Sequence, residues 1–345
     1  MKIAVLNNWV PFLRGGAEHL AEALTTKLVE YGHQAFLVRV PFRWDPPAKI
    51  IEHMVACRAM RLPNFDRVIG LKFPAYYIPH PNRVLWLLHQ FRQVYDLWDT
   101  PYQGIPSSEE GRRIRHAIIR SDNEFLREAK HIFTNSEITG ERLLKFNQLQ
   151  STVLYPPLLK QDHFFCGDHG DYLFAPGRIN SSKRQQLIVR SMRYCRTDAR
   201  LVIAGQAETA TDATALTALI REYRLEHKVQ FINRFITEDE KANWLAGAFA
   251  CAYLPYDEDS YGYVTLESCL SKKPVITSTD SGGVLALVKD GLTGLVVPPE
   301  PKALGQAIDQ LFENRAKTRA MGEAAFDRAN SLKINWHSVI SALTQ

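Results

Sequence analysis

Short apolar runs alternate along most of the chain with longer segments in which apolar residues recur every three or four positions. The first pair is the run 2–7 (KIAVLN) and the segment 17–32, whose spacing predicts an amphipathic helix. Strands that alternate with helices in this way predict a parallel sheet covered by helices on both faces. Further strands are predicted at 34–40, 66–70, 83–88 and 131–136.

The pattern pauses over residues 154–171, where tandem prolines and a polar, glycine-containing stretch are typical of a linker. It then resumes, and a length of 345 residues suits about two domains. We therefore predict two α/β domains, at 1–160 and 170–330. Residues 334–345 have the pattern of an amphipathic helix, whose packing partner periodicity alone does not give. The second series of predicted strands is 172–177, 199–205, 228–233, 249–255, 273–278 and 293–298.

Composition excludes several classes of protein. A net charge of +5, spread along the chain, is ordinary surface charge and does not indicate nucleic-acid binding. The five cysteines form no CxxC pair, so neither a zinc site nor a disulfide framework is predicted. The longest apolar run, 244–255, is shorter than the ~20 residues of a membrane span. We expect a cytoplasmic protein that would contact a membrane only at its surface. In the helical segment 109–130, the arginines at 112, 113, 115 and 120 are either a solvated face or such a contact. The oligomeric state is not readable from the sequence.

Candidate site residues follow predicted strands, because ligands of such sheets bind at the carboxyl ends of the strands. Gly15 and Gly16 come after the first strand and open a helix. Free N–H groups at a helix start favour an anion there, although a plain tight turn explains the pair equally well. The stretch lacks the GxGxxG spacing of dinucleotide-binding proteins.

Two cations follow the strand at 172–177. Arg178 offers a planar fork of donors and Lys183 a compact charge, and together they could clamp a diphosphate. The alternative is that both are solvated loop residues.

An acidic loop follows the strand at 249–255. Asp257, Glu258 and Asp259 could be read as a metal site. However, Asp259 and Glu267 are also spaced so that their carboxylates could accept hydroxyl groups from two sugar rings. The N–H groups of residues 261–263, at the start of the next helix, would then lie between them and meet a phosphate.

A histidine and several aromatic residues follow the strand at 83–88. His89 is either a structural residue or part of the site. Arg92, Tyr95 and Trp98 could pair with an anionic acceptor or stack on its sugar rings, or they could form a surface loop that packs on itself.

The segment 259–268 (DSYGYVTLES) resembles the E-x7-E motif of retaining glycosyltransferases of family 4, the group 1 glycosyltransferases. That motif is usually written E-G-F-G-x-x-x-x-E, so Asp259 replaces its first glutamate and Tyr261 its phenylalanine. Three more motifs occur in the family's order: GGAE at 15–18, PGRINSSK at 176–183, and SGGVLALVKDGLTGLVVPP at 281–299. They resemble the family's glycine loop, its G-R-x-x-x-x-K phosphate segment and its G-G-x-x-E run.

The resemblance implies a GT-B fold: two Rossmann-like, doubly wound α/β domains that face each other across a cleft. The first would hold the acceptor, the second the nucleotide sugar, and the last helix would cross back to the first. Glu267 would hold the ribose hydroxyls, and Asp259 would contact the transferred sugar. The predicted catalytic residues are His89, Arg178, Lys183 and Asp259. The predicted donor-binding residues are Gly15, Gly16, Arg178, Lys183, Tyr261, Gly262, Tyr263, Val264 and Glu267.

The implied activity is metal-independent transfer of a hexose-type sugar from a nucleotide-diphosphate sugar, with retention of configuration, as in polysaccharide biosynthesis. No cofactor is expected besides this donor, and the acceptor would be a glycan, a lipid-linked sugar or a small molecule. Two departures from the motifs are Asp259, which is one methylene shorter than glutamate, and Ala286, where the family has a glutamate. Three alternatives stay open: a nucleotide-sugar epimerase, a nicotinamide enzyme and a non-catalytic nucleotide-sugar-binding protein.

Overall fold

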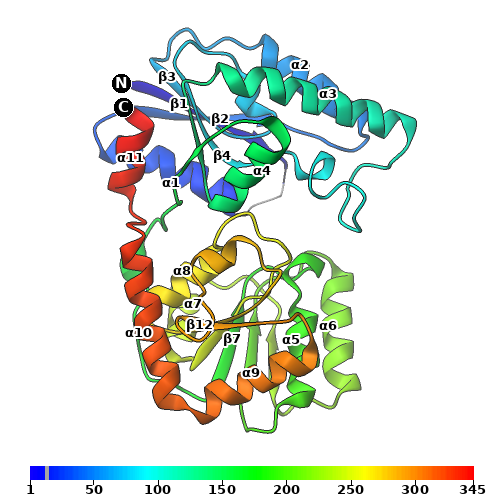
Figure 1. Ribbon diagram of the computed structural model, residues 1–345, viewed down its shortest axis with the longest axis vertical. Coiled ribbons are helices and arrows are strands. Elements are labelled where there is room, and N and C mark those ends of the chain that lie inside the picture. Colours follow the sequence, from blue (N-terminus) through cyan, green and yellow to red (C-terminus); the bar gives the residue numbers. More distant parts are fainter. Residues whose placement is uncertain (12–14) are drawn as a thin grey trace. The chain divides into compact units, whose positions relative to one another are not determined.

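The chain forms two compact units in a computed structural model that describes residues 1–11 and 15–345. The first unit comprises residues 1–159 and 335–345, and the second comprises residues 160–334. Each unit has a six-stranded sheet whose neighbouring strands run parallel, with helices on its faces (Figure 1). The predicted α/β fold class, with two parallel sheets, is confirmed.

The sheet of the first unit has the strand order β2-β1-β3-β4-β5-β6. Successive strands therefore lie on both sides of β1, as in other doubly wound sheets. The strands are β1 (Lys2–Trp9), β2 (Gln34–Pro41), β3 (Arg67–Lys72), β4 (Arg83–His89), β5 (His131–Thr134) and β6 (Thr152–Val153). The helices are α1 (Gly16–Glu30), α2 (Ala48–Ala59), α3 (Glu109–Phe125), α4 (Glu137–Asn147) and α11 (Trp336–Thr344), with short 3-10 turns η1 (Ala75–Tyr77), η2 (Arg92–Val94) and η3 (Leu126–Glu128).

Residues of β1 alternate between two cores, because successive side chains of a strand point to opposite faces of the sheet. Ala4 and Leu6 join the core that α2 and α3 cover. Ile3 and Val5 join the core that α1 covers. The last helix, α11, packs on this second core beside α1, so that both chain ends lie close together in this unit (Figure 1).

The second unit has the strand order β12-β11-β10-β7-β8-β9. Its strands are β7 (Tyr172–Pro176), β8 (Arg200–Ala204), β9 (Val229–Ile232), β10 (Ala250–Ala252), β11 (Val275–Ser278) and β12 (Gly294–Val297). Its helices are α5 (Gln185–Ser191), α6 (Ala210–Glu222), α7 (Glu238–Gly247), α8 (Tyr263–Leu270), α9 (Pro301–Glu313) and α10 (Arg315–Ser331), with 3-10 turns η4 (Gln161–His163), η5 (Ser181–Lys183), η6 (Met192–Tyr194) and η7 (Gly283–Ala286).

This order is that of a Rossmann sheet, in which the direction of winding reverses between two neighbouring strands, here β7 and β10. Leu173 of β7 joins a core shared with α5, α6 and α9. The next residue, Phe174, stacks on Trp244 of α7 with ring centroids 6.0 Å apart. Both faces of β7 are thus covered, which leaves the carboxyl end of the strand as the place for a ligand.

Helix starts follow local signals in the sequence. The side chains of Thr209 and Thr237 accept backbone N–H groups at the starts of α6 and α7, and each forms a capping box with the acidic residue three positions on. Sequence periodicity did not predict β6, which is two residues long. None of the described helices has the length and apolar character needed to cross a membrane.

Candidate functional site

The loops after β7 and β10 meet where the winding of the second sheet reverses. These strands pair in parallel, with Ala250 opposite Leu173 and Cys251 opposite Phe174. Their carboxyl ends therefore lie side by side, and the segments 177–184 and 253–262 follow them. The two loops are joined by the N–H group of Tyr256, which donates to the carbonyl of Ser182 over 2.8 Å.

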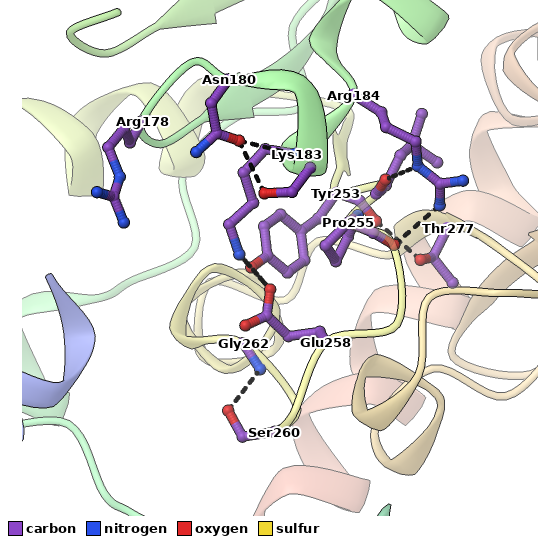
Figure 2. Close-up of polar contacts among 12 residues, drawn as sticks. Arg178, Asn180, Lys183, Arg184, Tyr253, Pro255, Glu258, Ser260, Gly262 and Thr277 are labelled. Atoms are coloured by element: carbon purple, nitrogen blue, oxygen red, sulfur yellow. Dashed lines mark hydrogen bonds and ion pairs between the residues drawn. The ribbon is translucent and has the colours of Figure 1, made fainter. Parts of the chain in front are cut away.

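Lys183 stands at the centre of the contacts between these loops (Figure 2). Its Nζ donates to the hydroxyl oxygen of Tyr253 over 2.9 Å and forms a short ion pair with Oε2 of Glu258. The Tyr253 hydroxyl also lies 2.9 Å from the same Oε2, so the three groups form a closed triangle. Burial disfavours the charged lysine, but Tyr253 and Glu258 outweigh it and raise the pKa of Lys183 above its usual value.

The carboxylate that reaches Lys183 belongs to Glu258, one residue before the position that the family motif indicates. Asp259, the predicted sugar contact, is half-buried on the same loop. Sequence reasoning missed Glu258 because three consecutive acidic residues give no sign of which one points toward the lysine. Tyr253 was missed too, since it reads as the end of an apolar strand.

Two glycines of the segment 281–299 hold the acidic loop in place. The Gly283 N–H donates to the Glu258 carbonyl over 2.8 Å, and the Glu258 N–H donates to the Ser281 carbonyl over 3.3 Å. Gly282 has a φ of +62°, and a Cβ there would lie 2.6 Å from the Glu258 carbonyl oxygen. Glycine is therefore required where this segment approaches the loop.

Arg184 also links the same loops through hydrogen bonds. Its guanidinium binds both carboxylate oxygens of Asp280 over 2.8 Å and donates to the carbonyls of Leu254 and Pro255. Such a bidentate pair fixes both direction and distance. Arg184 thus positions the strand ends that carry Lys183 and Tyr253.

The start of α8 lies against Tyr253. Gly262 precedes the helix with a φ of +69°, and a Cβ there would lie 2.4 Å from the Tyr253 ring. No side chain within the described part of the chain caps the N-terminus of α8. Its first N–H groups, at Tyr263 and Val264, thus begin beside the Lys183 triangle, whereas the side chain of Tyr261 is fully buried.

Glu267 lies inside the second unit with only 2% of its surface exposed. Its Oε1 is 2.6 Å from Nζ of Lys241 on α7, while its Oε2 has no hydrogen-bond partner among residues 1–11 and 15–345. Burial raises the pKa of Glu267, and Lys241 counteracts this rise. A buried carboxylate oxygen without a donor is able to accept ligand hydroxyls. Lys241 was not predicted, because nothing in the sequence links α7 to this glutamate.

Arg178 lies apart from Lys183. It is exposed, and its Nη1 is 3.9 Å from Oε2 of Glu208. Arg178 takes part in none of the contacts drawn in Figure 2. The predicted pair of cations is therefore not assembled around one point in this structure, and a joint role of Arg178 and Lys183 stays a prediction.

Ala286, which stands where the family motif has a glutamate, accepts two hydrogen bonds through its backbone carbonyl. Both come from Arg328 of α10, over 2.8 and 2.6 Å. The backbone of this segment is therefore held from behind, while its side chain offers no carboxylate.

In the first unit, Gly15 is extended and Gly16 begins α1. The Gly15 N–H donates to the carboxylate of Glu18 over 2.9 Å, and Glu18 lies 3.9 Å from Lys72. An anion at this helix start would have to share the site with Glu18. The preceding residues, 12–14, lie outside the described part of the chain.

His89 is the last residue of β4 and lies opposite Lys72 in the parallel register with β3. It is half-buried, and its Nδ1 is 2.5 Å from the carbonyl oxygen of Gln90. His89 and the start of α1 therefore both lie at the carboxyl ends of the strands of the first sheet, since β1, β3 and β4 are neighbours and run parallel. Its predicted role near the donor sugar is not tested by this geometry.

Of the predicted acceptor residues, Tyr95 occupies a place that does not suit the role. Tyr95 is 4% exposed, and its hydroxyl donates to Oδ2 of Asp122 over 2.7 Å. Its ring lies in the core and cannot stack on a sugar. Arg92 pairs with Asp96 over 2.6 Å, and the guanidinium of Arg115 lies 5.0 Å from the Trp98 ring centre.

Two parallel Rossmann-like sheets, with a lysine–carboxylate–tyrosine triangle where one of them reverses its winding, define a doubly wound α/β protein with a polar site at the switch point of its second sheet. Residues 167–328, nearly all of the second unit, match the family model of glycosyl transferases group 1. The second unit therefore matches this family, and the resemblance inferred from the motifs is confirmed at that level. Membership of family 4 stays a prediction.

Curated relatives match only parts of the chain. The α-1,3/1,6-mannosyltransferase ALG2 of Dictyostelium discoideum is 28% identical over 36% of this chain and 29% of its own length. A D-inositol 3-phosphate glycosyltransferase of Corynebacterium aurimucosum is 30% identical over 42% of this chain and 34% of its own length. The matched segments thus span about a third of these relatives.

Solved structures match nearly the whole chain. Sucrose-phosphate synthase of Thermosynechococcus elongatus covers 99% of it at a TM-score of 0.76 and 19% identity, with 97% of that chain matched. The Anabaena protein Alr3699/HepE, solved in complex with UDP and glucose, matches at a TM-score of 0.73 and 16% identity over both full chains. At such identities the likeness establishes the fold alone, and the predicted GT-B fold is confirmed.

Proposed function

We propose that the protein is a retaining glycosyltransferase that moves a hexose-type sugar from a nucleotide-diphosphate sugar to a glycan, lipid-linked or small-molecule acceptor. One observation carries the proposal. Lys183, with its hydrogen-bonding triangle, and Glu267, with its unpartnered oxygen, both follow the strands where the second sheet reverses its winding. A cation for the diphosphate and an acceptor for ribose hydroxyls are the two groups that a nucleotide-sugar site needs.

The chemistry would consist mainly of stabilising the diphosphate as it leaves. Lys183 and the uncapped start of α8 supply positive charge there, fixed in place before the donor arrives. Arg178 joins them if its exposed side chain turns toward the loop. In the retaining glycosyltransferases that the motifs resemble, the acceptor attacks on the face of the sugar from which the diphosphate leaves. A phosphate oxygen then takes the acceptor proton, so a protein base is not required.

Asp259 is proposed to contact the transferred sugar, and Glu267 the ribose. His89, at the carboxyl end of β4, is proposed to lie near the donor sugar, with Arg92 and Trp98 on the acceptor side. Tyr95 is buried in the core and is therefore left out of the proposed acceptor site. A UDP-sugar is the first donor to test, because the Anabaena relative in fold was solved with UDP-glucose.

Metal independence is part of the proposal. The acidic loop resembles a metal site in sequence, but an oxygen of its central residue, Glu258, is already bonded to Lys183 and Tyr253. Turnover is therefore expected to survive EDTA. Activity lost in chelator and restored by manganese or magnesium would overturn this part.

Thermal-shift screening against UDP-, GDP-, ADP- and dTDP-sugars tests the donor class. NMR of the product's anomeric carbon then tests retention. A second candidate, a non-catalytic nucleotide-sugar-binding protein, is favoured by Ala286 and Asp259, since both depart from the family motifs. Slow hydrolysis of the donor without acceptor excludes that candidate, whereas stabilisation by a donor with no turnover supports it.

A further inference from the structure

Glu258 is already paired with Lys183, the cation that the proposed function assigns to the donor diphosphate. Its Oε2 receives both Nζ of Lys183 and the hydroxyl of Tyr253. A phosphate oxygen carries the same sign of charge and accepts the same donors, at similar distances. The carboxylate oxygen thus stands where a phosphate oxygen of the donor would be placed.

The side chain of Glu258, rather than its backbone, is the part that is able to move. Its N–H and carbonyl are bonded to Ser281 and Gly283, and Gly282 approaches its carbonyl too closely for a Cβ. In contrast, the side chains of Lys183 and Glu258 are each 22% exposed, so the carboxylate has access to solvent. A χ rotation would release Lys183 without disturbing the loop.

We propose that Glu258 is a resident counterion of the free protein: it holds Lys183 and Tyr253 in place, and an incoming diphosphate displaces it. Lys183 then meets the donor already oriented, and the carboxylate competes with the phosphate for it. Glu258 is a positioning residue that acts through Lys183. This inference rests on the proposed function for the identity of the natural ligand, but not for the displacement itself.

The proposal predicts a gain of binding, which a purely structural role would not produce. Glu258→Gln keeps the size of the side chain and removes its charge, so it leaves Lys183 without an anionic partner. Calorimetric titration with inorganic pyrophosphate, at constant ionic strength, should show binding about tenfold tighter than in the wild type, the worth of one charged hydrogen bond.

Two further variants assign the effect. In Lys183→Met the same Glu258→Gln change should give no gain, because the contested cation is absent. Asp259→Asn is the matched control, since it removes the same charge from the adjacent residue. We expect less than about a twofold change in pyrophosphate affinity, because pyrophosphate lacks the sugar that Asp259 is proposed to contact. Thermal melts of all variants verify that the second unit is folded.

Unchanged or weaker pyrophosphate binding in Glu258→Gln would overturn the inference, as would an equal gain in Asp259→Asn or no binding by either protein at millimolar pyrophosphate. If Glu258→Gln gains pyrophosphate affinity through Lys183 but the protein binds no nucleotide sugar, the role of Glu258 as a counterion is supported and the proposed function is rejected. If the protein hydrolyses the donor but Glu258→Gln does not gain pyrophosphate affinity, the proposed function is supported and the counterion role is rejected.

Discussion

Each unit of the molecule buries a carboxylate, and the two are satisfied differently. Asp122 of α3 accepts three tyrosine hydroxyls: Tyr76 and Tyr77 at Oδ1, over 3.0 and 2.7 Å, and Tyr95 at Oδ2 over 2.7 Å. Glu267 of α8 has Lys241 at one oxygen and, in the part of the chain that is described, no donor at the other.

The difference separates a structural carboxylate from one available to a ligand. Asp122 receives every hydrogen bond from its own unit, so its burial serves the packing of η1, η2 and α3. Glu267 has one carboxylate oxygen, Oε2, without a donor among the described residues. A buried oxygen without a donor lowers stability, and ligand hydroxyls that bind to it can offset this loss. Both pKa values are raised by burial, and that of Asp122 reaches about 6 although the three hydroxyls lower it. The pKa shift alone would not have distinguished the two.

The largest effect is expected from Asp122→Ala, which leaves three buried tyrosine hydroxyls without their acceptor. Each unsatisfied group costs about 1–3 kcal/mol, so the first unit should lose about 3 kcal/mol or more of unfolding free energy. Urea denaturation followed by the fluorescence of the first unit measures the loss. Binding of nucleotide by the second unit should persist, and a selective loss of that binding with normal stability would contradict the structural role.

Asp122 also predicts a pH dependence with a definite sign. Its folded pKa, about 6, lies above the unfolded value, so the folded state holds its proton more tightly. The stabilisation of the fold that comes from this tighter proton binding is present at low pH and is lost as the pH rises from about 4 to 6. Asp122→Asn should remove this slope from the stability profile, and we expect the difference between the two proteins to change with pH only in that window. An unchanged profile would refute the assignment.

A smaller effect, on binding, is expected from Glu267→Gln. It should weaken nucleoside diphosphate and intact donor alike by about 10- to 100-fold, because the ribose is present in both and a charged hydrogen bond is worth about 1.5–3 kcal/mol. Calorimetry with the nucleoside diphosphate found in the donor screen measures this.

Asp259→Asn is the matched comparison, since the transferred sugar is absent from the free nucleotide. Nucleotide affinity should stay near that of the wild type while turnover falls about ten- to several-hundred-fold, as for one charged contact in the transition state. The opposite pattern in the two variants would show that the roles of Asp259 and Glu267 are reversed.

Lys241→Met should act through the pKa of Glu267. Without the lysine, burial raises that pKa further, so Glu267 takes up a proton as the pH falls and loses an acceptor. Nucleotide affinity of the variant should fall more steeply than that of the wild type as the pH decreases and recover as the pH increases. Glu238→Gln is the control, because Glu238 is an exposed partner of Lys241 at 3.0 Å. Parallel pH profiles for Lys241→Met and the wild type would contradict the proposal.

Tyr95→Phe should have the smallest effect. It removes one of the three hydroxyls around Asp122, which is worth about 1 kcal/mol of stability. Donor affinity and the KM for the acceptor should not change, since Tyr95 lies in the core. A raised acceptor KM without a loss of stability would instead indicate that the Tyr95 hydroxyl contacts the acceptor.

Particular elements show what the sequence was able to predict. Short continuous apolar runs located β1, β7 and β10, because a buried parallel strand must be apolar on both faces. Three of the four motifs located the loops that follow those strands, and the fourth, at 281–299, begins after β11. Motif glycines are readable in the sequence because they meet a local need, such as the positive φ at Gly262. In contrast, the two-residue β6 carries too few positions for any period to be read.

Side-chain partners depended on the tertiary structure, because they join residues that are distant in sequence. Lys183 meets Glu258 across 75 positions, and Lys241 meets Glu267 across 26. The sequence predicted that Tyr95 contacts a sugar, whereas in the structure Tyr95 follows η2 and its hydroxyl donates to Asp122. The last helix has an amphipathic pattern that suits either unit, and only the packing of α11 beside α1 decides between them. Local sequence sets which backbone a segment prefers, whereas the direction of a charge or an aromatic ring depends on which distant donor or acceptor the fold brings within about 3 Å.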